Sequence, residues 1–382
     1  MAWRALTRHV LPCGLALLAV AVACCQPCAG APTEPAIAAQ PVPEDRYPER
    51  RVEFASGVVG IPDLVYAVIP GYRPLHLDLY RPGDKQVSTV HPFVVYVHGG
   101  GWQSGHTRQS GAFSSWPDVL ASLAARGYVV ASVEYRLSAE ARFPAAEQDV
   151  KAAIRWLRTH ASSYGIDKSR SLIWGASAGG QLAALAATSC GVAKLEPAVA
   201  ESVGANPPSP SVPAGAAVRA AAAGTPAAVA ESDCVQAAVT WYGIFDFSTL
   251  AAQRDPNSPV ILGRSGSADT PYLGCTISSC APEVVSAASP VTYIDHDDPP
   301  MLLVHGSADK TVPVKQSQEM YDKLRAAGVA AKLLLIPGVD HSFIGKTPAD
   351  TQRASRAALT AVFEFIDATI GSKPPRVDDA SR

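Results

Sequence analysis

A serine stands at the centre of the run Gly-Ala-Ser-Ala-Gly at residues 175–179, between an apolar run and a segment of helical composition. A serine that ends a strand and begins a helix lies on a tight, strained turn, which tolerates only small flanking residues and exposes the hydroxyl. The amino end of a helix also favours negative charge that develops nearby. The pattern predicts that Ser177 is a nucleophile in acyl transfer.

A serine hydroxyl needs a base that takes its proton and a carboxylate that orients the base. Two later apolar runs lead into loops with these residue types: Asp309 follows 301–304, and His341 follows 333–336. Neighbouring parallel strands would bring both loops to the edge that carries Ser177. We therefore expect Asp309 to orient His341, and His341 to accept the serine proton and return it to the leaving group.

Other residues compete for these roles. Asp340 adjoins His341 on the chain and is expected to point elsewhere, and Asp298 is another rival acid. Asp246 follows the earlier apolar run 238–241, and it stays open as the alternative acid. His305 lies within an apolar strand, which favours a core histidine over a base.

The run His-Gly-Gly-Gly-Trp at residues 98–102 follows another apolar strand. Consecutive glycines let backbone N–H groups approach a substrate oxygen. We expect the N–H groups of Gly100, Gly101 and Ala178 to form an oxyanion hole. The run is not a dinucleotide-binding fingerprint, because Ser104 occupies the place of its last glycine.

Apolar runs of strand length alternate with helical segments, which predicts an α/β fold with a mostly parallel sheet and helices on both faces. The first two strands, joined by a short turn, are expected to be antiparallel. We expect strands at 75–80, 93–97, 128–133, 172–174, 238–241, 301–304 and 333–336, and helices at 119–126, 144–164, 178–188, 315–327 and 349–370.

The 382-residue chain has a net charge of −2, which excludes a generally basic nucleic-acid binder. Residues 1–30 resemble a signal peptide, with basic residues before the apolar run 11–23, which is shorter than the roughly 20 residues of a membrane span. We expect a secreted or periplasmic protein. An alternative is a lipoprotein with Cys24 lipidated, the one route by which we expect membrane association.

The composition of the chain after residue 30 predicts three segments. Residues 31–57 form a Pro-rich linker, 58–371 the catalytic domain and 372–382 a tail. Within the domain, 191–233 is an Ala- and Pro-rich insertion, either a lid over the site or a surface loop.

Four cysteines remain outside the leader, an even number in an exported chain. We pair Cys275 with Cys280, which close a short loop, and Cys190 with Cys234 at the two ends of the insertion. Metal binding by these four is disfavoured, because no Cys-x-x-Cys spacing occurs among them.

The motifs at 98–102, 134–137, 143–145, 175–180 and 305–309 resemble the hormone-sensitive-lipase-like branch of the α/β-hydrolases. The stretch from 288 to 343 is similar to bacterial esterases of the bifunctional feruloyl/acetyl-xylan type. The resemblance implies hydrolysis of carboxylic esters through a serine acyl-enzyme, without a cofactor. The chain departs from the lipase-like branch at 31–57, which looks unable to form the usual helical cap.

We therefore expect an exported serine carboxylesterase that takes short-chain or aromatic esters, either small molecules or carbohydrate-linked. Trp102 and Phe343 are predicted to line its substrate pocket. The alternatives are an amide hydrolase, either a peptidase or an arylformamidase, and a binding protein on a hydrolase scaffold. Asp149 is expected to be structural, and residues 295–298 to form a solvated loop rather than a cation site. We expect no metal, cofactor or nucleic acid to take part.

Overall fold

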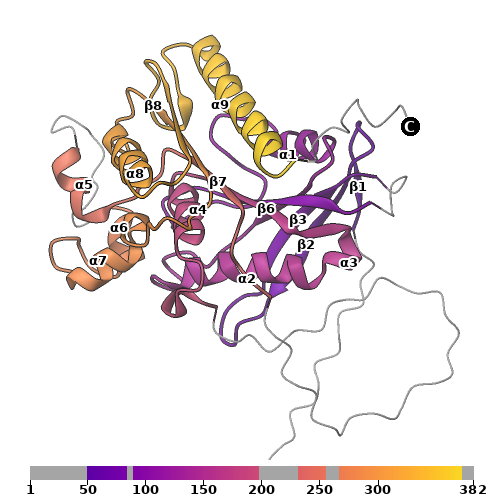
Figure 1. Cartoon of the computed structure of the whole chain (residues 1–382), viewed down its shortest axis with the longest axis horizontal. Helices are drawn as coiled ribbons and strands as arrows, with labels where there is room; N and C mark the ends of the chain where they lie inside the picture. The colour runs from indigo at the N-terminus through magenta and orange to yellow at the C-terminus, as the bar shows by residue number, and fades with distance from the viewer. Residues whose placement is uncertain (1–49, 84–88, 198–230, 255–265, 372–382) are drawn as a thin grey trace, which may run out of the picture. The chain divides into compact units, whose positions relative to one another are not determined.

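A computed structural model describes residues 50–83, 89–197, 231–254 and 266–371. Within these ranges the strands form one sheet, part of which is labelled in Figure 1. The strand order is β1-β2-β3-β5-β4-β6-β7-β8-β9. The pairs β1–β2, β2–β3 and β3–β5 are antiparallel, and every other pair is parallel. The strands are β1 Val52–Glu53, β2 Val59–Ala67, β3 Leu75–Arg81, β4 His91–Val97, β5 Val129–Val133, β6 Ile166–Ala176, β7 Ala237–Trp241, β8 Met301–Gly306 and β9 Ala331–Ile336.

Helices cover both faces of this sheet. The helices α1 and α9 pack on one face, and α2, α4 and α8 pack on the other. The helices are α1 Trp116–Ala124, α2 Ala145–Thr159, α3 Ala161–Tyr164, α4 Ala178–Thr188, α5 Phe247–Gln253, α6 Asp269–Leu273, α7 Pro282–Ala288, α8 Val314–Ala326 and α9 Pro348–Thr369. The α/β-hydrolase fold expected from the sequence is confirmed.

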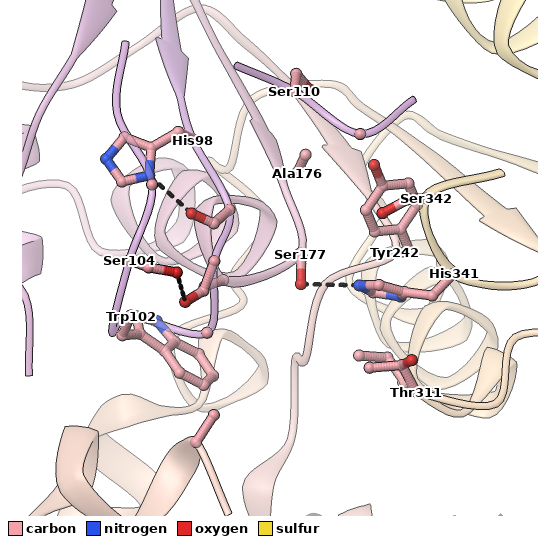
Figure 2. A pocket seen from close by; sticks show the side chains of 18 of the residues that line it. His98, Trp102, Ser104, Ser110, Ala176, Ser177, Tyr242, Thr311, His341 and Ser342 are labelled. Atoms are coloured by element: carbon pink, nitrogen blue, oxygen red, sulfur yellow. Dashed lines mark hydrogen bonds between the residues drawn. The ribbon is translucent and has the colours of Figure 1, made fainter. Parts of the chain in front are cut away.

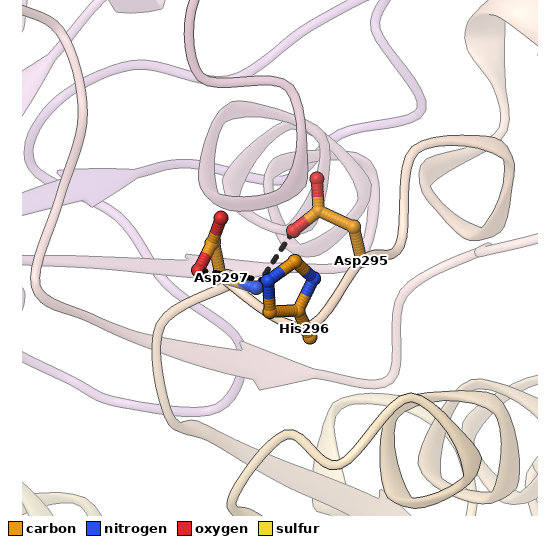
Figure 3. A group of neighbouring side chains, drawn as sticks. All are labelled: Asp295, His296 and Asp297. Atoms are coloured by element: carbon orange, nitrogen blue, oxygen red, sulfur yellow. Dashed lines mark hydrogen bonds and ion pairs between the residues drawn. The ribbon is translucent and has the colours of Figure 1, made fainter.

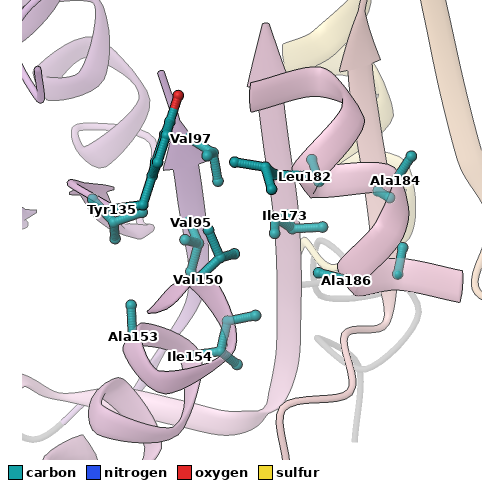
Figure 4. Packing of buried hydrophobic residues seen from close by; sticks show 14 of the residues in the cluster. Val95, Val97, Tyr135, Val150, Ala153, Ile154, Ile173, Leu182, Ala184 and Ala186 are labelled. Atoms are coloured by element: carbon teal, nitrogen blue, oxygen red, sulfur yellow. The ribbon is translucent and has the colours of Figure 1, made fainter. Parts of the chain in front are cut away.

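The central strands are apolar throughout because both of their faces are covered. In β4, Phe93, Val95 and Val97 belong to the core on one side, and Val94 and Tyr96 to the core on the other. Helix α2 meets the first of these cores through an apolar stripe that includes Val150, Ala153 and Ile154, as Figure 4 shows. The alternation along the strand and the helical spacing together fix which side of each element faces the sheet.

Several features differ from the sequence predictions, and one is the strand β2, which was not among the expected strands. The strand β1 lies inside the segment expected to be a linker, where Val52 and Glu53 pair with β2. The helix expected at 144–164 ends at Thr159 and restarts as α3, and at the break the carbonyl of Trp156 accepts from the ring of His160. The helices α5, α6 and α7 were not expected, because five to seven residues are too few to display a helical period.

Both expected disulfides are present, Cys190–Cys234 and Cys275–Cys280. The first joins the ends of the insertion, just after α4 and just before β7. Because α4 begins beside Ser177 and runs away from it for 11 residues, these ends lie at the edge of the sheet opposite the serine. Arg155 also binds Glu196 and Asp233 there, one on each side of the insertion.

Several predictions lie outside the described residues. They concern the leader 1–30 with Cys24, most of the linker, the tail 372–382 and the insertion from residue 198 to 230, including its role as lid or loop. Within the described ranges, no helix combines the length and the apolar character that crossing a membrane requires.

Candidate active site

Ser177 lies between the end of β6 and the start of α4, in a backbone conformation that non-glycine residues rarely adopt, with φ 55° and ψ −119°. Its N–H donates to the carbonyl of Trp241 over 2.8 Å, and its carbonyl accepts from the N–H of Gln181 over 3.0 Å. These two bonds hold the strained turn from both sides. Strain of this kind costs of order 1–3 kcal/mol and persists where the surrounding structure imposes it, most often at functional sites.

The glycines that flank Ser177 leave no room for a side chain. A Cβ atom on Gly175 would lie 2.0 Å from the carbonyl oxygen of Gly179, and one on Gly179 would lie 2.1 Å from that of Val97. Both separations are far inside van der Waals contact. The spacing of small residues around the serine is therefore what lets the strand, the turn and the helix pack this closely.

We predict that Gly179→Ala destabilises the fold by about 3 kcal/mol or more. An alanine in place of a helical glycine ordinarily stabilises a protein slightly, so a loss would come from the contact with Val97, which overpacks a well-filled site. Urea unfolding of both proteins measures the difference. The control is Gly328→Ala, which meets no neighbouring atom and should cost only the roughly 1 kcal/mol of its left-handed backbone. Equal losses in the two variants would contradict this account.

His341 links Ser177 to Asp309. The Oγ atom of Ser177 lies 3.0 Å from Nε2 of His341, and Nδ1 of His341 lies 2.8 Å from Oδ2 of Asp309. Figure 2 shows the imidazole facing the serine hydroxyl across the cavity. Asp309 comes from the loop after β8 and His341 from the loop after β9. The structure thus brings together the three side chains that the sequence assigned to a triad.

The carboxylate of Asp309 is enclosed by hydrogen-bond donors. Its Oδ1 atom accepts from the N–H groups of Thr311 and Val312, each over 2.8 Å, and its side chain is fully buried. Burial by itself would raise the pKa of Asp309, but hydrogen bonds from His305 and His341 outweigh it and lower the pKa. The group is therefore ionised at neutral pH and suited to stabilise a positive imidazole.

Backbone N–H groups converge beside Ser177. Gly100 and Gly101 have φ values of 112° and 60°, which glycine adopts readily. Both line the same cavity as Ser177 and Ala178. Among the described residues, the N–H groups of Gly100, Gly101 and Ala178 have no hydrogen-bond acceptor. Such free donors are the components of an oxyanion hole.

His98 anchors the glycine loop. Its Nδ1 atom lies 2.7 Å from the carbonyl oxygen of Gly99, which can only accept, so this nitrogen carries the proton. The hydroxyl of Tyr135 donates to the carbonyl of His98, and the two rings stack with their centroids 4.4 Å apart. Burial lowers the pKa of His98 to about 4, so the ring is neutral at pH 7. The sequence did not single out His98 for this role.

The cavity above Ser177 has a volume of about 930 Å³. Its walls include two loops that the sequence analysis did not identify, 104–113 after the glycine run and 266–268 before α6. Among the described residues, no Asp, Glu, Lys or Arg lines it. A neutral, hydroxyl-bearing lining favours an uncharged ligand, because a charged group would lose its hydration without gaining an opposite charge.

The two predicted pocket aromatics have different positions. Trp102 lines the cavity, stacks on Tyr272 at 4.4 Å and donates its indole N–H to Gln181. Phe343 is not among the described residues that line the cavity, and its ring packs against Trp241 in the core. Phe343 and Ser342 both have left-handed backbone, each with φ 59°.

The competing acids serve local structure. Asp246 accepts from the N–H of Ser248 and caps α5, and Asp340 accepts from the N–H groups of Lys310 and His341. Asp149, expected to be structural, forms an ion pair with Arg136.

The cluster Asp295–Asp297 is exposed, and the N–H of Asp297 donates to the carboxylate of Asp295 (Figure 3). The fourth member of that loop, Asp298, is partly buried, and burial raises its pKa to about 7. None of these contacts distinguishes a cation site from the solvated loop that the sequence favours.

Comparison with known proteins places this geometry in a family. The BD-FAE family model matches residues 77–324. The probable carboxylic ester hydrolase LipM of Mycobacterium tuberculosis is 29% identical, over 76% of this chain and 57% of its own length. The ethyl acetate hydrolase of Pseudomonas putida is 27% identical, over 74% of this chain and 76% of its own length. The chain spans about three fifths of the length of the first curated relatives, at 57%, 62% and 56%.

Solved structures share the fold. A truncated carbohydrate esterase from gut microbiota is similar with a TM-score of 0.62 and 24% identity, covering 83% of this chain and 98% of its own. Native esterase 2 from Thermogutta terrifontis is similar with a TM-score of 0.56 and 26% identity, covering 82% of this chain and 93% of its own.

Proposed function

The chain belongs to the BD-FAE family, and from this premise we propose that it hydrolyses carboxylic esters with Ser177 as nucleophile, His341 as base and acid, and Asp309 as the orienting carboxylate. The observation that carries the proposal is the unbroken line of contacts from Ser177 Oγ through His341 to Asp309, at 3.0 and 2.8 Å. The line ends in a cavity lined by free backbone donors.

The proposed reaction has two steps. The oxygen of Ser177 attacks the ester carbonyl carbon while its proton passes to Nε2 of His341, and negative charge on the carbonyl oxygen is held by the N–H groups of Gly100, Gly101 and Ala178. Collapse breaks the bond to the alcohol oxygen, which takes the proton from His341. A water then repeats the sequence on the acyl-enzyme, releasing the carboxylic acid and restoring the serine.

Short or aromatic acyl groups on a neutral alcohol fit this site best. Support comes from the uncharged lining and from Trp102, Phe113 and Tyr242, whose side chains contribute to the walls. The relatives include proteins named ethyl acetate hydrolase and carbohydrate esterase, and we carry these two substrate types to this chain as part of the proposal. Export is proposed as well, and the two disulfides support an oxidising compartment.

We predict that nitrophenyl acetate and butyrate are hydrolysed faster than the decanoate and palmitate esters. Each CH₂ group that finds no wall to contact forgoes about 0.8 kcal/mol of burial, so long chains gain little here. Initial rates at one pH, below the solubility limit of each ester, measure the preference. A preference for palmitate, or a jump in rate at an oil–water interface, would contradict the prediction.

A peptide amide and a formanilide belong in the same set of substrates. Comparable kcat/KM values for these amides and for the acetate ester would favour the amide-hydrolase alternative over the esterase. If no substrate is turned over and a serine-directed fluorophosphonate does not label Ser177, the binding-protein alternative gains support.

A further inference from the structure

His305 is a second histidine beside the carboxylate of Asp309. It lies in β8, and its side chain is fully buried. Its Nε2 atom lies 3.2 Å from Oδ2 of Asp309 and 3.0 Å from the carbonyl oxygen of Val312. Its Nδ1 atom lies 2.7 Å from the hydroxyl oxygen of Ser317 in α8. Both ring nitrogens are therefore occupied, and the ring joins a strand, a loop and a helix.

These contacts determine which nitrogen donates. A carbonyl oxygen can only accept, so Nε2 of His305 carries a hydrogen whatever the charge of the ring. That hydrogen points to the side of the ring where both Val312 O and Asp309 Oδ2 lie. The atom Oδ2 is also the one that accepts from Nδ1 of His341. One carboxylate oxygen thus faces two histidines.

The contact between Nε2 of His305 and the carbonyl of Val312 also affects Oδ1, the other carboxylate oxygen of Asp309. The loop from Asp309 to Val312 wraps the carboxylate, and the N–H groups of Thr311 and Val312 hold Oδ1. Because His305 holds the carbonyl of Val312, it also fixes the loop that supplies those donors. The orientation of the carboxylate towards His341 therefore depends on His305 through both oxygens.

We propose that His305 is a positioning residue for catalysis, which acts by holding the Asp309 carboxylate and its loop so that Oδ2 faces His341. The proposal rests on the proposed esterase function. This role differs from that of a general base, because the ring contacts neither Ser177 nor the cavity. It also differs from that of an ordinary core side chain, because both ring nitrogens make polar contacts. The supporting bond to Ser317 keeps the ring from turning within β8.

The test compares His305→Leu with His305→Gln. Leucine removes every polar contact of the ring, whereas glutamine offers an N–H donor towards Val312 and Asp309 and an oxygen acceptor for Ser317. We expect kcat of His305→Leu on nitrophenyl acetate to fall roughly 10²-fold with KM little changed, the size of loss that a misplaced catalytic group causes. Glutamine should keep kcat within about fivefold of the parent protein.

A pH profile separates positioning from loss of packing. Among the described residues, His305 and His341 donate to the Asp309 carboxylate, and the charge of Asp309 also acts on Tyr242. Burial raises the pKa of Tyr242, so it stays neutral through the range. In His305→Leu the carboxylate is free to turn away from His341 and stabilises the protonated imidazole less, so the acid limb of kcat/KM should move to lower pH. Ser317→Ala should show a smaller movement in the same direction.

Active-site labelling distinguishes a variant that does not fold from a result that contradicts the proposal. Labelling with a fluorophosphonate gives the fraction of competent protein, and all rates are expressed per labelled site. The control His91→Leu removes a half-buried histidine that contacts the carbonyl of Gly127 at the start of β4. It should leave both kcat and the acid limb unchanged.

An unchanged kcat and acid limb in His305→Leu would overturn the proposal. So would a fall in kcat with the acid limb unmoved, or a glutamine variant as impaired as the leucine variant. If the parent protein is not labelled at Ser177, the proposed esterase function itself fails, which is a different result from any of these.

Discussion

Ser177→Ala is expected to lower ester hydrolysis by roughly 10⁴- to 10⁶-fold, the usual cost of losing the nucleophile of a triad. The Oγ atom of Ser177 is the hydroxyl within 3.0 Å of Nε2 of His341. Without it, His341 has no proton to take and no acyl-enzyme forms. The fold should be unaffected, because both backbone bonds of Ser177 use main-chain atoms that alanine also has.

Turnover of nitrophenyl acetate and labelling by a fluorophosphonate measure the effect. The label should attach to Ser177 in the parent protein, identified by peptide mass, and should be absent from the alanine variant. Ser163→Ala, in the short helix α3, serves as the control and should retain full activity. Residual activity within tenfold of the parent, or labelling at another serine, would reject Ser177 as the nucleophile.

The sequence pattern was sufficient to predict the parts of the site that depend on a single strand and the loop after it. The apolar runs before Ser177, Asp309 and His341 predicted three parallel strands, and β6, β8 and β9 are parallel members of the sheet. Loops that follow such strands leave from the same edge. The shared edge therefore follows from strand direction, and the proximity of the three residues also requires the strand order β6-β7-β8-β9.

The residues that form the cavity walls could not be predicted from the sequence pattern. Loop 104–113 has no period to interpret, and it is held by a buried network in which Asp78 accepts from Thr107 and Arg108. Those contacts join it to β3, which the chain order does not reveal. The core position of Phe343 was not predicted either, and the left-handed backbone at this non-glycine residue also leaves no mark in the sequence.

The position of the insertion in the fold also could not be predicted from the sequence. Its composition left a lid and a surface loop equally open. The disulfide Cys190–Cys234 and the pairs of Arg155 with Glu196 and Asp233 place both ends at the sheet edge opposite Ser177. Among the described residues, the segment 266–268, between α5 and α6, lines the cavity. Short helices with little periodicity flank it, so nothing in its pattern indicated a role.

The second large effect expected is a loss of roughly 10⁴-fold in kcat for Asp309→Asn, with the fold retained. An asparagine side chain has one oxygen and one NH₂ group. Since the N–H groups of Thr311 and Val312 point at Oδ1, the asparagine oxygen will face them and its NH₂ group will face His341. The Nδ1 atom of His341 must then accept rather than donate. Its proton moves to Nε2, which can no longer take the proton of Ser177.

Asp246→Asn is the matched comparison, because it makes the same chemical change in the competing acid. Asp246 accepts from the N–H of Ser248 at the start of α5, a capping bond that asparagine also provides, so turnover should stay within about twofold of the parent. The values of kcat for both variants, with the folded fraction of each checked by circular dichroism, decide between the acids. If Asp246→Asn cripples turnover and Asp309→Asn does not, then the carboxylate that follows β8 is not the one that orients His341.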